Sequence, residues 1–379
     1  MSELPELREP DLPRTAKIRQ RALRTGWTTG TCASAAAKAA ALLLRHGEPP
    51  PPWVEVGLPS GRRVTFVIER CVRVGDAAQA VVVKDAGDDP DVTHGAHLTA
   101  TVSWRDVPGV ALDGGEGVGV VTKPGLGLPV GGPAINPVPR AMISQAVREV
   151  VGERGVVVVV SVPDGERMAR RTTNRRLGIL GGISILGTTG VVRPFSTASW
   201  RASVVQAVQV AAAQGERTIV LCTGGRTEAG AVALLPDLAE VCFVEVGDFT
   251  GAALRTAVER GVSRVVFVGM VGKLSKLAAG VLMTHYTRSA VDPGLLAALT
   301  ADAGGDRSTV DAVRAANTAR HAYELWAAAG LVGAAGDLLC ARVRDVLVAF
   351  ARGRVTADVA MVDFTGRTVV AATEPAWVR

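Results

Sequence analysis

Short apolar runs alternate with helical segments through most of the second half of the chain. The runs at residues 218–222, 241–246 and 264–268 are mostly apolar and rich in β-branched side chains, and a segment with helical periodicity follows each one. Strands of this kind are typical of a parallel sheet that helices cover on both faces. The sequence therefore predicts an α/β fold with a Rossmann-like parallel sheet in its C-terminal part.

The N-terminal half predicts a mixed α+β part. We expect helices over residues 32–44 and 140–151, and strands at residues 53–58, 64–69, 78–84 and 98–104. Residues 109–139 are dense in Gly and Pro, and their apolar residues argue against simple disorder. The predicted organisation is an N-terminal arm at 1–24, an α+β domain at 25–155 and a Rossmann-like domain with C-terminal helices at 156–379.

Composition excludes several classes of protein. No apolar run approaches the roughly 18 residues of a membrane span, and the N-terminal segment lacks the apolar core of a secretory signal. The five Cys are scattered without a CxxC pair, so we expect a cytoplasmic protein with neither a disulfide framework nor a zinc cluster. Aromatic residues make up 4% and are not interleaved with basic ones, so nucleic acid is not an expected partner.

Four predicted strands of the C-terminal part end in loops that contain Gly, at residues 187–190, 223–226, 247–248 and 269–273. In an open parallel sheet, ligands bind beyond the carboxyl ends of the strands, where Gly lets backbone N–H groups come close to them. Each Gly has the alternative role of making a tight turn. Asp248 is placed either to accept from ribose hydroxyls or to cap the next helix.

Other segments carry chemistry that is also open to a structural explanation. Residues 26–32 open a helix with three Thr hydroxyls, which suits an anion, but Cys32 has no adjacent base and packing is its favoured role. The acidic segment 85–94 suits a hard cation or an Arg-paired loop, and the Arg-rich segment 167–176 suits a polycarboxylate or a solvated surface. His285 suits proton transfer, axial ligation or helix capping.

Long strings of unusual sequence stand at residues 23–33, 87–95, 118–125, 133–139, 177–190, 272–280 and 284–285. Together they resemble the pattern of the cobalt-precorrin-5B C1-methyltransferases, the CbiD family, in order over about residues 21–290. The chain departs from that pattern at Met270, where His is common, at Asp248, where Asn is common, and at Tyr286, where Ser is common.

The resemblance implies an enzyme that transfers a methyl group from S-adenosyl-L-methionine to C1 of cobalt-precorrin-5B, giving cobalt-precorrin-6A in cobalamin biosynthesis. Cobalt arrives inside the tetrapyrrole substrate, so no metal site of the protein is expected, and a homo-oligomer is one expected assembly. Transfer from a sulfonium to a ring carbon needs positioning and a dry pocket rather than an activated protein nucleophile. A net charge of +6, carried mainly by Arg, suits the carboxylate arms of the macrocycle.

The predicted site follows from the strand-end rule together with the resemblance. Adenosylmethionine is expected at the C-terminal sheet edge, on Thr223, Gly224, Gly225, Asp248 and Gly269. His285 is the expected catalytic residue. The tetrapyrrole is expected in a cleft, against the Thr-rich turn and the Gly/Pro-rich segment, with contacts from Thr28, Thr29, Thr31, Asp91, His94, Lys123, Asn136, Arg171 and Lys273.

Two other functions remain open from the sequence. A small-molecule kinase would bind phosphate at the helix start formed by residues 28–31. A corrinoid-binding or delivery protein would bind the tetrapyrrole without methylating it.

Overall fold

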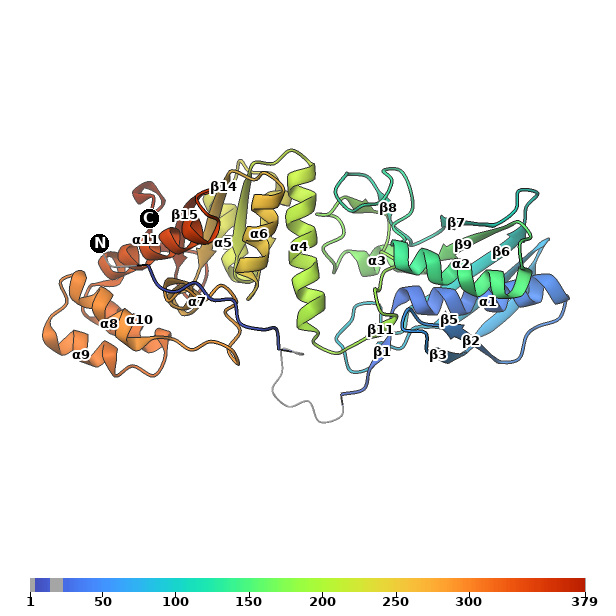
Figure 1. Cartoon of the computed structure of the whole chain (residues 1–379), viewed down its shortest axis with the longest axis horizontal. Helices are drawn as coiled ribbons and strands as arrows, with labels where there is room; N and C mark the ends of the chain where they lie inside the picture. Colours follow the sequence, from blue (N-terminus) through green and yellow to red (C-terminus); the bar gives the residue numbers. More distant parts are fainter. Residues whose placement is uncertain (1–3, 14–22, 379) are drawn as a thin grey trace. The chain divides into compact units, whose positions relative to one another are not determined.

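The computed structural model describes residues 4–13 and 23–378, which divide into two compact units (Figure 1). The α+β unit comprises Arg19–Phe195, and the Rossmann-like unit comprises Met1–Ile18 together with Ser196–Arg379. Of the expected N-terminal arm, residues 1–3 and 14–22 lie outside the described residues. The Rossmann-like unit is thus made from two separate stretches of the chain, and the α+β unit is formed by the stretch between them.

The α+β unit is built on a mostly antiparallel sheet with strand order β4-β5-β6-β9-β7. Its strands are β4 (Arg70–Val74), β5 (Ala77–Val83), β6 (His97–Trp104), β7 (Val110–Gly114) and β9 (Val156–Ser161). Helix α1 (Thr29–His46) lies on β5 and β6 and also packs against α2 (Pro137–Val151). The smaller elements are the pairs β1 (Gly26–Trp27) with β11 (Val191–Val192), β2 (Trp53–Gly57) with β3 (Arg63–Val67), and β8 (Val120–Val121) with β10 (Ile179–Leu180), and helix α3 (Gly165–Ala169).

Helix α1 is buried along most of its length because most of its side chains are small. Its Ala residues favour the helix and let its backbone approach the sheet and α2 closely. Thr28 caps its start, and Gly47, with a φ of 82°, ends it by donating its N–H to the Leu43 carbonyl oxygen. This helix is the centre of the core of the unit.

The Rossmann-like unit has a sheet with strand order β13-β12-β14-β15-β16, in which β16 alone is antiparallel to its neighbour. The strands are β12 (Thr218–Cys222), β13 (Phe243–Glu245), β14 (Arg264–Gly269), β15 (Thr356–Val362) and β16 (Val369–Ala372). Buried Val, Ile, Leu and Phe fill β12 and β14, as expected for central parallel strands. The predicted Rossmann-like sheet is confirmed.

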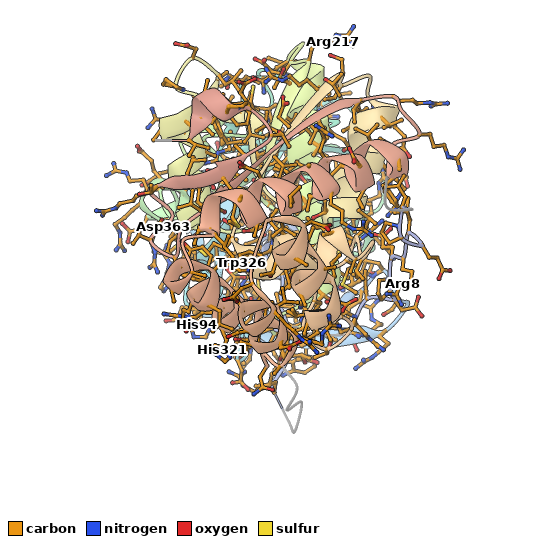
Figure 2. All side chains as sticks on the ribbon, turned by 90° about the vertical axis from the view of Figure 1, so that its left-hand side faces the viewer. Arg8, His94, Arg217, His321, Trp326 and Asp363 are labelled. Atoms are coloured by element: carbon orange, nitrogen blue, oxygen red, sulfur yellow. The ribbon has the colours of Figure 1, made fainter. Side chains whose placement is uncertain are left out.

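Helices cover both faces of this sheet. The helices that contact the strands are α4 (Thr197–Ala213), α5 (Gly225–Leu234), α6 (Thr250–Glu259), α7 (Val271–Ala278) and α11 (Val332–Phe350). Helices α8 (Pro293–Asp302), α9 (Arg307–Arg314) and α10 (Ala319–Ala328) pack mainly on one another and on α7 and α11. Helix α4 packs on α6, while α5 packs on β12, β13 and β14. Because parallel crossovers are almost always right-handed, the strand order β13-β12-β14 places α5 and α6 on opposite faces. Trp326 is fully buried among the C-terminal helices, where its indole N–H donates to Thr300 Oγ1 at 2.7 Å (Figure 2).

Two expectations about the division of the chain differ from the structure. The boundary between the units lies between Phe195 and Ser196 rather than between residues 155 and 156. Strand β9 pairs with β6 and β7, so it belongs to the α+β sheet. The loop at residues 187–190 therefore lies in the α+β unit, where the Thr31 hydroxyl donates to the Gly190 carbonyl oxygen at 2.7 Å, and not at the edge of the parallel sheet.

The described residues include all five cysteines, and each is a free thiol. None of the helices in the described ranges combines the length and apolarity that a bilayer crossing requires.

Candidate functional site

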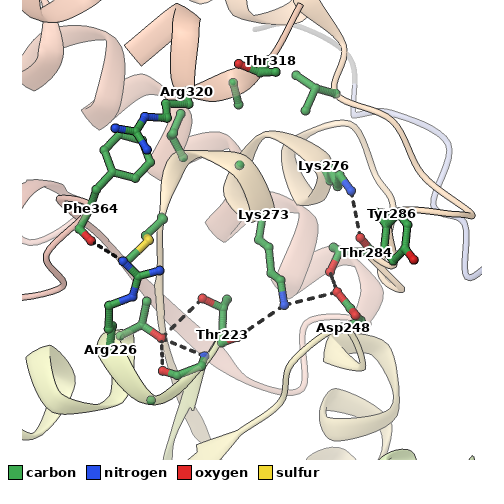
Figure 3. Close-up of a pocket in the computed structure, with 18 residues that line it drawn as sticks. Thr223, Arg226, Asp248, Lys273, Lys276, Thr284, Tyr286, Thr318, Arg320 and Phe364 are labelled. Atoms are coloured by element: carbon green, nitrogen blue, oxygen red, sulfur yellow. Dashed lines mark hydrogen bonds and ion pairs between the residues drawn. The ribbon is translucent and has the colours of Figure 1, made fainter. Parts of the chain in front are cut away.

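A pocket of about 790 Å³ opens in the Rossmann-like unit where β12, β13 and β14 end (Figure 3). Its volume is typical of a site for a small molecule or cofactor. The strand-end loops supply Thr223, Gly224, Gly225, Arg226, Thr227, Asp248, Met270, Val271, Gly272 and Lys273. Later parts of the chain supply Lys276, Thr284, Tyr286, Val291, Thr318, Ala319, Arg320 and Phe364.

Local sequence explains the shape of two of these loops. The Thr227 hydroxyl donates to the Gly224 carbonyl oxygen at 2.7 Å and accepts from the Gly224 N–H at 3.0 Å, which fixes the start of α5. Gly247 has a φ of 54°, and a Cβ there would lie 2.4 Å from the Trp200 ring. A glycine is therefore required at the turn that presents Asp248 to the pocket.

Asp248 and Lys273 form the polar floor of the pocket. Lys273 Nζ lies 2.8 Å from the Gly247 carbonyl oxygen, 3.3 Å from the Thr223 carbonyl oxygen and 3.2 Å from Asp248 Oδ1. The Thr284 hydroxyl donates to the same Asp248 oxygen at 2.9 Å. The Asp248 side chain is 16% exposed, and its other oxygen, Oδ2, has no hydrogen-bond partner in the described part of the chain. That oxygen remains as an acceptor for ligand hydroxyls.

A second ammonium, that of Lys276, lines the same wall. Lys276 Nζ donates to the Thr284 carbonyl oxygen at 2.9 Å. Burial lowers the pKa of Lys276, the Asp248 carboxylate opposes that shift, and the charge of Lys273 adds to it. The site thus holds one amine that is easier to deprotonate than a surface lysine.

Positive charge exceeds negative charge around the pocket. Its basic lining residues are Arg226, Lys273, Lys276 and Arg320. Among the described residues that line the pocket, Asp248 is the acidic one. Helices α5, α7 and α10 also direct their N-terminal ends at it. The electrostatics therefore favour a ligand with anionic groups.

Comparisons with known proteins place the chain in a family. The CbiD family model matches residues 16–194, and the model described as the CbiD C-terminal domain matches residues 283–373. A protein of Salinispora arenicola named cobalt-precorrin-5B C(1)-methyltransferase is 73% identical, and the match covers 97% of each chain. The chain belongs to the CbiD family. A Rubrobacter xylanophilus relative with the same name is 65% identical, over 96% of this chain and 95% of its own.

A solved structure titled as the cobalamin biosynthesis protein (cbiD) of Archaeoglobus fulgidus is 31% identical to this CbiD chain. The match covers 69% of this chain and 81% of the solved chain, with a TM-score of 0.36.

In this CbiD protein, the structure brings most of the predicted cofactor residues together. Thr223, Gly224, Gly225 and Asp248 line the pocket, as does Lys273, which had been assigned to the tetrapyrrole. Gly269 is buried at the end of β14, outside the set of residues that line the pocket.

The predicted catalytic residue, His285, lies next to this site but does not face it. Its side chain is 3% exposed and is outside the set of lining residues. Its Nδ1 lies 2.7 Å from the Thr287 hydroxyl oxygen and accepts from the Thr287 N–H at 3.3 Å. This geometry holds the turn that follows Thr284, and it supports a positioning role rather than contact with a ligand.

The Thr-rich helix start in the α+β unit is closed rather than open to a ligand. Thr28, Thr29 and Thr31 are all buried. The Thr28 hydroxyl accepts from the Thr31 N–H at 3.2 Å, and the Thr29 hydroxyl accepts from the Leu186 N–H at 2.9 Å. These hydroxyls tie the chain around residues 184–190 to the start of α1, so they act within the fold.

The acidic segment forms a second internal network. Lys84 is 1% exposed, and its ammonium pairs with Asp91 Oδ2 at 2.8 Å, while Asp91 Oδ1 accepts from the hydroxyl and the N–H of Thr93. The ring of His94 is exposed, but its Nδ1 accepts from the Ala86 N–H at 3.1 Å. In the described residues, no group of three or more His, Cys, Asp and Glu is arranged to hold a metal ion.

The remaining predicted tetrapyrrole contacts lie on the surface of the α+β unit. Lys123 and Arg171 are exposed, and Asn136 is half-buried at the start of α2. Their role in binding stays a prediction.

Sequence reasoning missed several residues of the pocket. Lys276 lies one turn after Lys273 on α7, and Arg226 stands inside a loop that the strand-end rule already selects, so both carried a local signal. Arg320 begins α10 and Phe364 follows β15. Nothing in the sequence around Arg320 and Phe364 indicates that the fold brings them to this edge.

Proposed function

We propose that this CbiD protein methylates C1 of cobalt-precorrin-5B to give cobalt-precorrin-6A during corrin-ring biosynthesis, with S-adenosyl-L-methionine as methyl donor. The relatives that cover nearly the whole chain carry the name of this activity. The observation that carries the donor assignment is the pocket at the carboxyl ends of β12, β13 and β14. That edge is where Rossmann-like sheets bind nucleoside-containing ligands.

The residues of the pocket fit such a donor. At Gly225, a Cβ would meet open space, so the backbone at the start of α5 is accessible to a ligand. Asp248 Oδ2 suits ribose hydroxyls, and the Lys276 ammonium suits the carboxylate of an amino acid. When bound, the donor supplies a methyl group on a sulfonium, which is transferred directly to the ring carbon.

The contribution of the protein is then positioning. The floor formed by Asp248, Lys273 and Thr284 is rigid because each side chain is hydrogen-bonded to another strand-end group. A rigid site holds donor and acceptor in the reactive geometry, which lowers the entropic part of the barrier. Cobalt enters as part of the substrate, and the reaction uses no protein nucleophile.

The kinase alternative has little support in the structure, because the hydroxyls of Thr28, Thr29 and Thr31 are buried and bonded to other parts of the α+β unit. A cytoplasmic location remains part of the proposal, because five free thiols suit a reducing compartment.

The deciding experiment incubates the purified protein with cobalt-precorrin-5B and adenosylmethionine that carries a labelled methyl group. The expected product is a macrocycle labelled at C1, formed together with the demethylated donor. The Gly225→Val variant serves as the matched control, because it adds bulk to a pocket-lining backbone position where a Cβ meets no other protein atom. Tight tetrapyrrole binding without labelled product would instead identify a corrinoid carrier.

A further inference from the structure

Two arginines contact Phe364 at the end of the pocket opposite Asp248, Arg320 at its ring and Arg226 at its backbone (Figure 3). The Arg226 Nη1 donates to the Phe364 carbonyl oxygen at 2.8 Å. The Arg320 guanidinium carbon lies 4.8 Å from the centre of the Phe364 ring. We call Arg226, Arg320 and Phe364 the arginine rim.

The fold holds the arginine rim in place from three directions. Arg226 lies in the first turn of α5, Arg320 in the first turn of α10, and Phe364 in the turn between β15 and β16. That turn contains Gly366, with a φ of 78°, where a Cβ would lie 2.5 Å from the Arg226 carbonyl oxygen. Because the turn and α5 touch at the backbone, Arg226 and Phe364 keep a fixed spacing.

Both guanidinium groups retain donors for a ligand. Each has five N–H donors in a planar fork. In the described part of the chain, Arg226 directs one donor to Phe364, and Arg320 directs its Nε to Glu324 Oε1 at 3.0 Å. Phe364 is half-buried, and Tyr323 packs edge-on against its ring with ring centres 5.0 Å apart. The rim therefore offers forked cationic donors beside an apolar face.

We propose that the arginine rim binds a carboxylate arm of the tetrapyrrole acceptor, with Phe364 against the edge of the macrocycle. Forked guanidinium donors match a carboxylate, and an aromatic ring matches a flat conjugated ligand. The other end of the pocket, with Asp248 and Lys276, is taken by the donor in the proposed function, so the arginine rim is left for the acceptor. This inference rests on the proposed function and adds to it the substrate contacts within the Rossmann-like unit.

The test measures two affinities on full-length variants. The probes are uroporphyrin, a stable tetrapyrrole with acetate and propionate arms, followed by its fluorescence, and adenosylmethionine, followed by calorimetry. The variants are Arg226→Gln and Arg320→Gln, and the matched control is Arg307→Gln, an exposed arginine of α9 outside the pocket. We expect each rim variant to bind uroporphyrin about tenfold more weakly or worse, with adenosylmethionine affinity and the control unchanged.

Two further measurements separate binding from folding. Arg320 is exposed, so Arg320→Gln should keep the wild-type melting temperature even if Arg226→Gln loosens the turn at Phe364. The charge-conserving Arg226→Lys should recover part of the lost affinity, and rising salt should weaken uroporphyrin binding less in the Gln variants than in the wild type.

Three results would overturn the inference: wild-type protein that does not bind uroporphyrin, unchanged uroporphyrin affinity in both Gln variants, or a loss confined to adenosylmethionine. The last result would assign the rim to the carboxylate of the donor. Failure of the proposed function has a different signature, because a protein that does not transfer the methyl group still shows rim-dependent uroporphyrin binding if the rim is correctly assigned.

Discussion

The ammonium of Lys273 is bound to Asp248 Oδ1 at 3.2 Å, and its two further contacts reach the carbonyl oxygens of Gly247 and Thr223. An ammonium has three N–H donors, and here two of them reach carbonyl oxygens while the Asp248 carboxylate lies within ion-pair distance. The sequence had assigned Lys273 to a carboxylate of the substrate. The geometry instead supports a positioning residue that links the ends of β12 and β13 to α7.

Replacing Lys273 by Met should destabilise the Rossmann-like unit by about 1.5–3 kcal/mol, because the acceptors around it lose a charged donor. Adenosylmethionine binding should weaken as well, since Asp248 loses a bond that orients it. Urea unfolding gives the first quantity and calorimetry the second. Lys276→Met is the comparison, and we expect it to cost less, because burial already disfavours the charged form of Lys276. Equal costs for the two variants would contradict the positioning role.

The substitution Gly225→Val should weaken adenosylmethionine binding by about tenfold or more while the melting temperature stays close to that of the wild type. The new side chain points into open space at the pocket, where it blocks the approach of the ligand to the backbone. Gly333→Val, at the start of α11, also meets open space and controls for the helix propensity of Val. Undiminished adenosylmethionine binding in Gly225→Val would show that the donor does not bind at this edge of the sheet.

Cys32→Ala should keep measurable turnover. The thiol is fully buried in α1, and burial raises its pKa to about 12, so a thiolate is scarce at neutral pH. Steady-state assays of the folded variant test this directly. Complete loss of activity in a protein that still binds both ligands would show that Cys32 takes part in the chemistry.

The α+β unit should lose stability in acid through Glu149. Hydrogen bonds from Arg63, and then from Lys38, lower the pKa of this carboxyl from its usual 4.5 to about 2. Since the folded state holds the lower pKa, the contribution is complete above about pH 4.5 and disappears as the pH falls towards 2. Glu149→Gln should therefore be less stable than the wild type at pH 7, by about 1 kcal/mol or less for a pair this close to the surface, and the difference should vanish near pH 2.

Unfolding curves at several pH values check the Glu149 prediction. Glu153→Gln, an exposed carboxylate just after α2, is the control. A Glu149→Gln deficit that stays constant from pH 7 to pH 2 would contradict the assigned cause.

The strand-end loops at Thr223, Asp248 and Lys273 could be predicted because they depend on short-range sequence. Each follows an apolar strand directly and carries its own Gly. Because the carboxyl ends of parallel strands lie at one edge of a sheet, this is enough to predict that the loops lie together. Strand β9 could not be assigned in this way. Its run of valines is typical of a central parallel strand, yet it joins the α+β sheet, and composition does not state which partner a strand selects.

Pocket residues that come from distant parts of the chain could not be predicted from the sequence either. Arg320 and Phe364 reach the pocket through the packing of α10 and of the turn after β15, which no local pattern encodes. His285 is a different case. Its place after a predicted helix suited proton transfer, axial ligation or capping, and in the fold its Nδ1 lies against Thr287 and its ring is buried, which does not favour the catalytic assignment.

The N-terminal segment of the Rossmann-like unit has a consequence for synthesis on the ribosome. The Arg8 N–H donates to the Gly280 carbonyl oxygen at 2.8 Å, and the Arg8 carbonyl oxygen accepts from the Leu282 N–H at 2.8 Å. At translation rates of about 5–20 residues per second, roughly 15–50 s pass between the emergence of the two partners. The whole α+β unit is translated in that interval. The segment around Arg8 therefore has to wait for its partners while the α+β unit is made, and a nascent chain stalled before Gly280 would leave this segment without the backbone groups that bind it.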